Sequence, residues 1–234
     1  MRVPTGELSL DDPDVSLSSW NSRDATPCNW YGVTCAGDAS NTTVTALDLS
    51  DTNIGGPFLA NVLCRLPNLL SINLLNNSIN QTLPLDISLC RNLRHLDLSQ
   101  NLLTGLLPAT LPLLPNLRYL DLTGNNFSSP IPDSFGTFQN LQVLSLVSNL
   151  LEGTIPPPSL GNVSSLKMLN LSYNPFFSGR IPPELGNLTN LEVLWLTQCN
   201  LVGVIPTSLG NLNKLQDLDL ALVINIMVRK TWDS

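Results

Sequence analysis

Leucine recurs at intervals of 24 or 25 residues through most of this chain. The units begin at Leu69, Leu93, Leu117, Leu141, Leu166, Leu191 and Leu215. Each reads L-x-x-L-x-L-x-x-N-x-L-x-G-x-I-P-x-x-L-G-x-L with variations; a weaker unit precedes them from Val44, and the last loses the pattern after Leu220. We count seven complete units and a fragment. So regular a period is typical of a solenoid, in which each unit forms one coil of a stack.

The spacing inside the unit predicts one short strand per coil. In Leu-x-Leu, alternate residues of a strand point to the same side, so both leucines face one way. Strands that recur once per unit in the same direction form a parallel sheet. Because a single coil cannot bury its own leucines, the neighbouring coils must supply the core.

An asparagine follows the strand in five units. These residues are Asn77, Asn101, Asn125, Asn149 and Asn174, and Cys199 holds the place in the sixth unit. We expect each amide to turn inward and to bind backbone groups of its own coil and of the next coil, because buried backbone groups need partners. The thiol of Cys199 is a weaker donor. The Gly-x-Ile-Pro segment then extends the chain, and proline fixes φ and shortens the helical return.

Composition excludes several classes of protein. Only 12% of residues are charged, about half the usual share. A net charge of −7 and scattered Lys and Arg argue against nucleic acid as a partner. The 43% apolar content excludes wholesale disorder. No apolar stretch reaches the roughly 18 residues of a membrane span, and Met1 to Glu7 contains no apolar signal-peptide core. We therefore expect neither a span nor a secretion signal within this chain, whose ends we interpret as incomplete.

The repeat core resembles leucine-rich repeats. Its continuation in Gly153-Thr154-Ile155-Pro156 and Gly203-Val204-Ile205-Pro206 resembles the plant-specific subtype. Ser18-Ser19-Trp20 and the stretch Pro27-Cys28-Asn29-Trp30-Tyr31-Gly32-Val33-Thr34-Cys35 look like the N-terminal cap of plant leucine-rich-repeat receptors. Segments 63–67, 76–80 and 193–203 are similar to HAESA-type receptor kinases. The resemblance extends from Asp11 to Leu220.

This resemblance implies a fold and a function. The fold would be an α/β right-handed leucine-rich-repeat solenoid with a concave parallel sheet, short 3-10 or helical turns on the convex side, and an N-terminal disulfide cap. The ectodomains of such receptors bind small secreted peptide hormones on the concave face and recruit a shorter leucine-rich-repeat co-receptor kinase. The full-length protein would signal from the plasma membrane, its ectodomain facing the apoplast. The chain has no kinase motifs, so we expect no enzyme activity and no cofactor.

The five cysteines differ in how clearly the sequence assigns them to disulfides. In the cap, Cys28 and Cys35 flank Trp30, and we expect them to pair. Cys64 and Cys90 lie about one repeat apart, so stacking could bring them within disulfide reach. Their unequal offsets from the unit leucines oppose that pairing, which the sequence leaves open. Cys199 remains as a buried free thiol.

Seven Asn-x-Ser/Thr sequons occur in the chain. We expect six of them to accept glycans: Asn41, Asn76, Asn80, Asn126, Asn162 and Asn187. Asn170 is a poor acceptor because it lies in the middle of a strand. Sequons together with a cap disulfide indicate an oxidising, glycosylating compartment.

His95, Asp97 and Ser99 offer the residue types of a nucleophilic triad on one strand face. Residues two apart in a strand are separated by about 6.6 Å and residues four apart by about 13 Å, so His95 cannot reach Ser99. Asp97 and Asp121 would stack about 4.8 Å apart on neighbouring strands, as consensus polar positions of the repeat. We expect no catalytic site and no metal site.

Three outward positions per unit form columns along the concave face, and from the third unit on they become apolar. We expect an extended peptide to bind there, with Asp97 and Asp121 tuning polar contacts at its edge. The predicted ligand-binding residues are Tyr119, Asp121, Val143, Val147, Met168, Val193 and Trp195. Exposed apolar surface marks binding sites, and Trp and Tyr are favoured anchors. The alternative is that these residues are tolerated strand formers.

We divide the chain into a cap (1–43), a solenoid (44–220) and an atypical tail (221–234). The leading hypothesis is the ligand-recognition part of a plant receptor-like kinase. Alternatives are a secreted inhibitor of cell-wall hydrolases with similar repeats, or a truncated product without a role of its own. The truncated product is supported by four apolar residues that would lack a covering repeat: Leu218, Leu220, Ile224 and Ile226.

Overall fold

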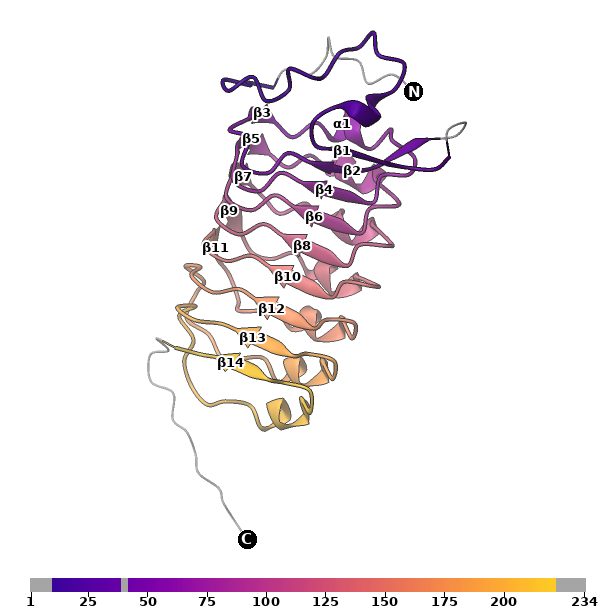
Figure 1. The fold of residues 1–234 in the computed structure, drawn as a ribbon. Coiled ribbons are helices and arrows are strands. Elements are labelled where there is room, and N and C mark those ends of the chain that lie inside the picture. Colours follow the sequence, from indigo (N-terminus) through magenta and orange to yellow (C-terminus); the bar gives the residue numbers. More distant parts are fainter. Residues whose placement is uncertain (1–9, 39–41, 222–234) are drawn as a thin grey trace.

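The computed structural model describes residues 10–38 and 42–221, which form a curved stack of coils (Figure 1). The predictions for Asn41 and for residues 222–234 lie outside these ranges. The main sheet has nine strands in the order β1-β2-β4-β6-β8-β10-β12-β13-β14. Their bounds are β1 Val33–Ala36, β2 Thr43–Asp48, β4 Ser71–Asn73, β6 His95–Asp97, β8 Tyr119–Asp121, β10 Val143–Ser145, β12 Met168–Asn170, β13 Val193–Trp195 and β14 Asp217–Asp219.

The strands from β2 to β14 are parallel and pair at equivalent positions of successive units. His95 faces Tyr119, for example, and Leu144 faces Leu169. The predicted parallel sheet is thereby confirmed. The cap adds one feature, because β1 runs antiparallel to β2 and closes the first edge of the sheet.

A second sheet runs beside the first, which the sequence did not reveal. It has five strands in the order β11-β9-β7-β5-β3, and Figure 1 shows it along the left side of the stack. The strands are β3 Gly55–Pro57, β5 Ser78–Thr82, β7 Leu102–Gly105, β9 Asn126–Ser129 and β11 Leu150–Leu151. They lie in the segments that follow the asparagines. Past β11 the pairing shrinks to one isolated bridge between Gly179 and Leu201.

Short helical turns return the chain to the main sheet. They are α1 Ala60–Leu63 and the 3-10 helices η1 Pro27–Asn29, η2 Leu85–Leu89, η3 Leu111–Leu113, η4 Asp133–Thr137, η5 Pro158–Asn162, η6 Pro183–Asn187 and η7 Thr207–Asn211. Extended prolines such as Pro182 precede five of them, since fixed φ holds the chain open before the turn. These helices of the described chain are too short to cross a membrane.

The strand leucines form a continuous core. Leu96, Leu120 and Leu144 are fully buried, as are their equivalents in the next two units. Burying each such side chain contributes about 2 kcal/mol of transfer free energy, shared between neighbouring coils. At the end of the described stack, Leu218 is 42% exposed, as expected for a coil with no described neighbour on one side.

The asparagines make the predicted inward hydrogen bonds, but their second coil is the preceding one rather than the next. Asn101 Nδ2 donates to Leu98 O and Ser99 O of its own coil and to Leu74 O of the coil before. Its Oδ1 accepts from Ile79 N, again in the preceding coil. The side-chain amide thus points back toward the preceding coil, where both Leu74 O and Ile79 N lie.

Both disulfides form in the structure. Cys28 and Cys35 close the cap, with Cα atoms 5.6 Å apart, beneath a stacked Trp20–Trp30 pair with ring centroids 5.2 Å apart. Cys64 and Cys90 also pair, with Cα atoms 4.4 Å apart. Each cysteine directly follows a helical turn, Cys64 after α1 and Cys90 after η2, so the two occupy equivalent places despite their unequal offsets from the unit leucines. Cys199 is a buried free thiol, as predicted.

Candidate functional site

The first column of concave residues forms a single row of neighbours, which we call the concave row. Backbone pairing places its members on five adjacent strands in register: His95, Tyr119, Val143, Met168 and Val193. All five side chains are half-buried. Four predicted ligand-binding residues are thus brought together, and they form a mostly apolar strip across the middle of the sheet.

His95 extends this strip by one strand. Its ring stacks on that of Tyr119, with centroids 4.2 Å apart and planes 15° apart. The Tyr119 hydroxyl donates to Asp121 Oδ2 at 3.2 Å, so the phenol is held in place at both ends. The sequence contains this signal, because His95 and Tyr119 occupy equivalent positions of adjacent units, but the predicted ligand-binding set does not include His95.

The second column has a structural role in most units. Its Asp or Asn side chain accepts a hydrogen bond from the backbone N–H two residues later and thereby caps the end of the strand. Six residues do so: Asp48, Asn73, Asp97, Asp121, Asn170 and Asp219. These polar positions are therefore explained by the fold, including Asp121 of the predicted set.

Trp195 departs from this pattern. An indole cannot accept the hydrogen bond, and Thr197 N instead donates to Ser172 Oγ of the preceding coil at 3.1 Å. Trp195 is paired in register with Asn170 and remains half-buried on the concave face. A large aromatic side chain thus stands where most units have a capping side chain, and the Ser172 hydroxyl provides the acceptor for Thr197 N.

The third column is less exposed than predicted. Ser99, Ser172 and Thr197 are buried, because the chain begins to turn inward there. Val147, the one predicted ligand-binding residue in this column, is half-buried. The accessible strip is therefore narrower than three full columns.

Burial and negative charge shape the acidic end of the strip. Desolvation raises the pKa of Asp121, and the neighbouring carboxylate of Asp97 adds to the increase, while hydrogen bonds from Thr123 oppose it. Desolvation also raises the pKa of Tyr119, as do the charges of Asp121 and Asp97. Tyr119 therefore remains a neutral hydroxyl that can donate.

His95, Asp97 and Ser99 are not arranged as a catalytic triad. Ser99 donates from both N and Oγ to Asp97 Oδ1, while His95 stacks on Tyr119. Asp97 thus serves as a strand cap. Within residues 10–38 and 42–221, no group of three or more His, Cys, Asp and Glu side chains could hold a metal ion.

The expected glycan acceptors differ in exposure. Asn76, Asn126, Asn162 and Asn187 are exposed and Asn80 is half-buried. Asn170 is buried within β12, in keeping with its exclusion. None of the five belongs to the concave row, so glycans at these positions would leave that row open.

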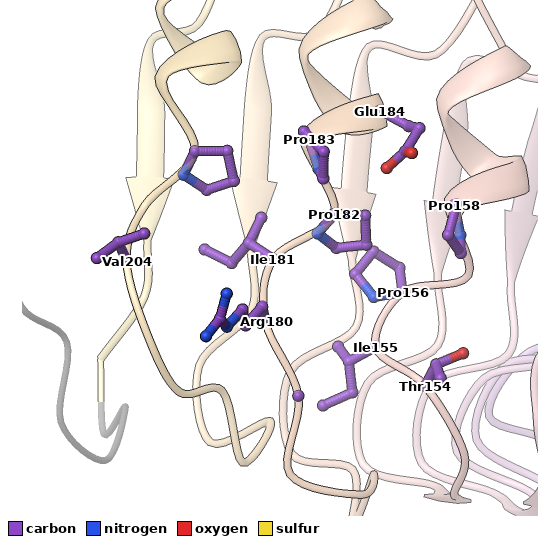
Figure 2. A pocket seen from close by; sticks show the side chains of 12 residues that line it. Thr154, Ile155, Pro156, Pro158, Arg180, Ile181, Pro182, Pro183, Glu184 and Val204 are labelled. Atoms are coloured by element: carbon purple, nitrogen blue, oxygen red, sulfur yellow. The ribbon is translucent and has the colours of Figure 1, made fainter.

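A hollow of about 420 Å³ lies where the second sheet has ended. The Gly-x-Ile-Pro segments of three units line it, and Figure 2 shows Pro156, Pro182 and Pro183 gathered around it, with Arg180 and Glu184 on its border. None of the predicted ligand-binding residues contributes to this hollow.

A model described as "Leucine-rich repeat region" matches residues 68–233, and one described as "Leucine rich repeat N-terminal domain" matches residues 8–36. The first match covers more than half of the chain. The chain belongs to the leucine-rich-repeat family. The paired cysteines of the cap and the stacked coils are thus the expected parts of such a protein.

Relatives of this leucine-rich-repeat chain include receptor kinases of Arabidopsis thaliana. Receptor-like protein kinase HSL1 is 68% identical over 88 residues, which make up 38% of this chain and 8% of that protein. The crystal structure of the Arabidopsis receptor kinase HAESA with the peptide hormone IDA and the co-receptor SERK1 matches with a TM-score of 0.86 and 51% identity, covering 94% of this chain and 36% of that one. PEPR1 with AtPEP1 matches with a TM-score of 0.81 and 35% identity, covering 93% and 30%.

The chain therefore spans a small part of the receptors that it resembles. It covers 8% of HSL1, 36% of the HAESA chain and 30% of the PEPR1 chain. The similarity is to an ectodomain and not to a kinase.

Proposed function

We propose that this chain is the ligand-recognition part of a receptor-kinase ectodomain that binds a small secreted peptide on its concave row. The observation that supports this best is Trp195, an aromatic side chain placed where other units carry a strand cap. Together with Tyr119, Val143, Met168 and Val193 it provides an apolar strip bordered by a hydroxyl and a carboxylate, Tyr119 and Asp121. Val147 widens the strip at one end.

An extended peptide suits this surface. The concave row, from His95 to Val193, crosses five strands at about 4.8 Å per strand, so a peptide lying along the stack would contact one of its side chains per coil. Apolar peptide side chains would pack on the valines and Trp195, while a backbone carbonyl or hydroxyl would accept from Tyr119. The HAESA structure contains the peptide hormone IDA and the co-receptor SERK1, which supports a peptide ligand and a shorter co-receptor as partners here.

The proposal also places the chain outside the cell, as a glycosylated and disulfide-bonded unit without catalysis of its own. It retains the division into a cap (1–43), a solenoid (44–220) and a tail (221–234). Signalling would depend on a membrane span and kinase elsewhere in a longer protein. The oxidised cysteines Cys28, Cys35, Cys64 and Cys90 support an oxidising compartment.

Isothermal titration of the chain with IDA peptide tests this proposal. Trp195→Ala and Tyr119→Ala should each weaken binding by at least about tenfold, because aromatic anchors contribute more than about 1.4 kcal/mol each. Tyr173→Ala is the matched control, since Tyr173 is an aromatic residue, 51% exposed, that lies outside the concave row. Its affinity should stay unchanged.

Circular dichroism would verify that all three variants are folded. Equal affinities of the folded Trp195→Ala variant and the unaltered chain would refute the proposed surface. If IDA does not bind at all, the other named peptide, AtPEP1, becomes the second probe, and failure of both would refute the peptide-binding function itself.

A further inference from the structure

Positive charge is concentrated on one side of this acidic molecule. Eight Lys and Arg residues lie in the described ranges, and six of them occur in the segments that lead from the helical turns into the strands of the main sheet. They are Arg65, Arg91, Arg94, Arg118, Lys167 and Lys214. The one acid in these segments, Glu192, pairs with Lys167 at 3.4 Å. The remaining acids of the described chain lie elsewhere.

Four arginines occupy adjacent coils, and we call them the basic edge: Arg65, Arg91, Arg94 and Arg118. All four are exposed, and in the described part of the chain their guanidinium groups form no hydrogen bond or ion pair. Unpaired arginines clustered on a chain of net charge −7 are not explained by solubility, which the acids already provide.

Backbone hydrogen bonds hold the basic edge in fixed register. Arg94 N donates to Leu70 O, and Arg118 N donates to Arg94 O, both at 2.8 Å. Side-chain amides reinforce the same flank, since Asn92 Nδ2 donates to Pro67 O and Asn116 Nδ2 donates to Arg91 O. Arg94 and Arg118 are therefore presented at equivalent positions of adjacent coils on a rigid surface.

An open hollow of about 480 Å³ adjoins the basic edge. It is lined by Ala36, Gly37, Thr43, Thr45, Asn68, Leu70 and Asn92. Asn92 directly follows Arg91 in the chain, and Leu70 is hydrogen-bonded to Arg94, so the hollow and the arginines form one surface. The side-chain amides of Asn68 and Asn92 donate to the protein, to Thr43 Oγ1 and Pro67 O, while their Oδ1 atoms accept no hydrogen bond within the described residues.

We propose that the basic edge and this hollow bind an acidic oligosaccharide, a chain of sugars that each carry a carboxylate. The guanidinium forks of Arg91, Arg94 and Arg118 match carboxylates with paired hydrogen bonds. Free amide oxygens in the hollow accept hydrogen bonds from sugar hydroxyls. A linear polymer with regularly repeated charge suits Arg94 and Arg118, which occupy equivalent positions of adjacent coils, with Arg91 beside them.

Other polyanions fit this surface less well. A protein partner would require an apolar and aromatic core, whereas none of the residues that line the hollow is aromatic and its polar side chains are hydroxyls and amides. Nucleic acid would meet the acidic remainder of the molecule. The inference is independent of the peptide proposal, because the concave row and the basic edge share no residue.

Biolayer interferometry with immobilised, unesterified galacturonate oligomers tests the proposal. The chain is first treated with an endoglycosidase, because the Asn41 sequon ends at Thr43 of the hollow. We expect saturable binding that weakens with added salt and disappears when the same oligomer is fully methyl-esterified. Arg91→Gln with Arg94→Gln should reduce affinity at least about tenfold, the equivalent of one charge-assisted hydrogen bond.

Arg23→Gln with Arg180→Gln is the matched control, since it removes the same charge from arginines off the basic edge and should retain full affinity. Arg91→Lys with Arg94→Lys should show an intermediate loss, because the charge remains and the fork is lost. Absence of binding, equal binding by the two double-glutamine variants, or tighter binding to poly-glutamate than to the sugar would each overturn the proposal. The last result would indicate an acidic protein instead.

Discussion

At the scale of single residues, Cys199 shows how far one side chain can depart from the repeat. It occupies the position of the inward asparagines, and burial raises the pKa of its thiol to about 12, so it stays protonated. Its Sγ donates to Leu171 O of the preceding coil at 3.2 Å. In the preceding unit, Asn174 Oδ1 accepts a hydrogen bond from Leu151 N at 3.1 Å. The equivalent donor for Cys199 is Phe176 N, and the thiol does not accept from it.

Cys199→Asn should therefore stabilise the chain. The amide would restore the missing acceptor and a second donor, and we expect a gain of about 1 kcal/mol in the free energy of unfolding. Urea denaturation followed by circular dichroism measures it, with Cys199→Ala as the destabilised comparison. A Cys199→Asn variant that is less stable than the unaltered chain would show that the packing around the smaller thiol leaves no room for the amide.

Asp121 lies at the acidic end of the concave row, and its pKa is raised by desolvation and by Asp97. A carboxyl whose pKa is higher in the folded chain binds more protons there, so stability falls as pH rises through that range. Asp121→Asn removes this effect while keeping the cap, as Asn73 and Asn170 do in other units.

The Asp121→Asn variant should thus gain stability at pH 7, by less than about 1 kcal/mol because the side chain is half-exposed. The gain should vanish when the pH is lowered below the ordinary value of 3.8. Unfolding free energies at both pH values provide the measurement. A gain that is the same at both would mean that charge is not its origin.

At the scale of elements, the sequence predicted the strands and the inward asparagines because their spacing is strict. It did not predict the second sheet, since the segments after the asparagines share no side-chain alternation and their pairing depends on neighbouring coils. It also did not predict the left-handed residue before each asparagine, such as Gln100 and Ser148. Gly124 is the one glycine at this position before the five inward asparagines, and glycine is the residue that tolerates positive φ best.

The asparagine ladder is the element on which the coils depend most. Asn125 donates to Leu98 O at 2.9 Å and Leu122 O at 3.1 Å, and accepts from Leu103 N at 3.0 Å. Asn125→Ala leaves these buried groups without partners and should cost about 3 kcal/mol. Asn116→Ala removes one exposed bond to Arg91 O and should cost less than about 0.5 kcal/mol. Similar losses in denaturant titrations of the two variants would contradict the ladder's role.

At the scale of the whole molecule, the proposed binding surface is assembled from residues about 25 positions apart. The sequence could identify the concave row because each coil repeats the same register, so Tyr119, Val143, Met168 and Val193 were predictable. It could not show that Trp195 replaces a strand cap, because that depends on Ser172 of another coil. The stacking of His95 on Tyr119 likewise requires the distance between strands.

Photo-crosslinking tests the central claim, that the concave row binds an extended peptide, most directly. An IDA peptide carrying a photoreactive side chain would be irradiated with the chain, and the attached residues identified by mass spectrometry. We predict attachment to the concave row and Trp195, with Met168 and Tyr119 prominent. Attachment confined to the helical turns or the second sheet, with the concave residues unmodified, would contradict the account.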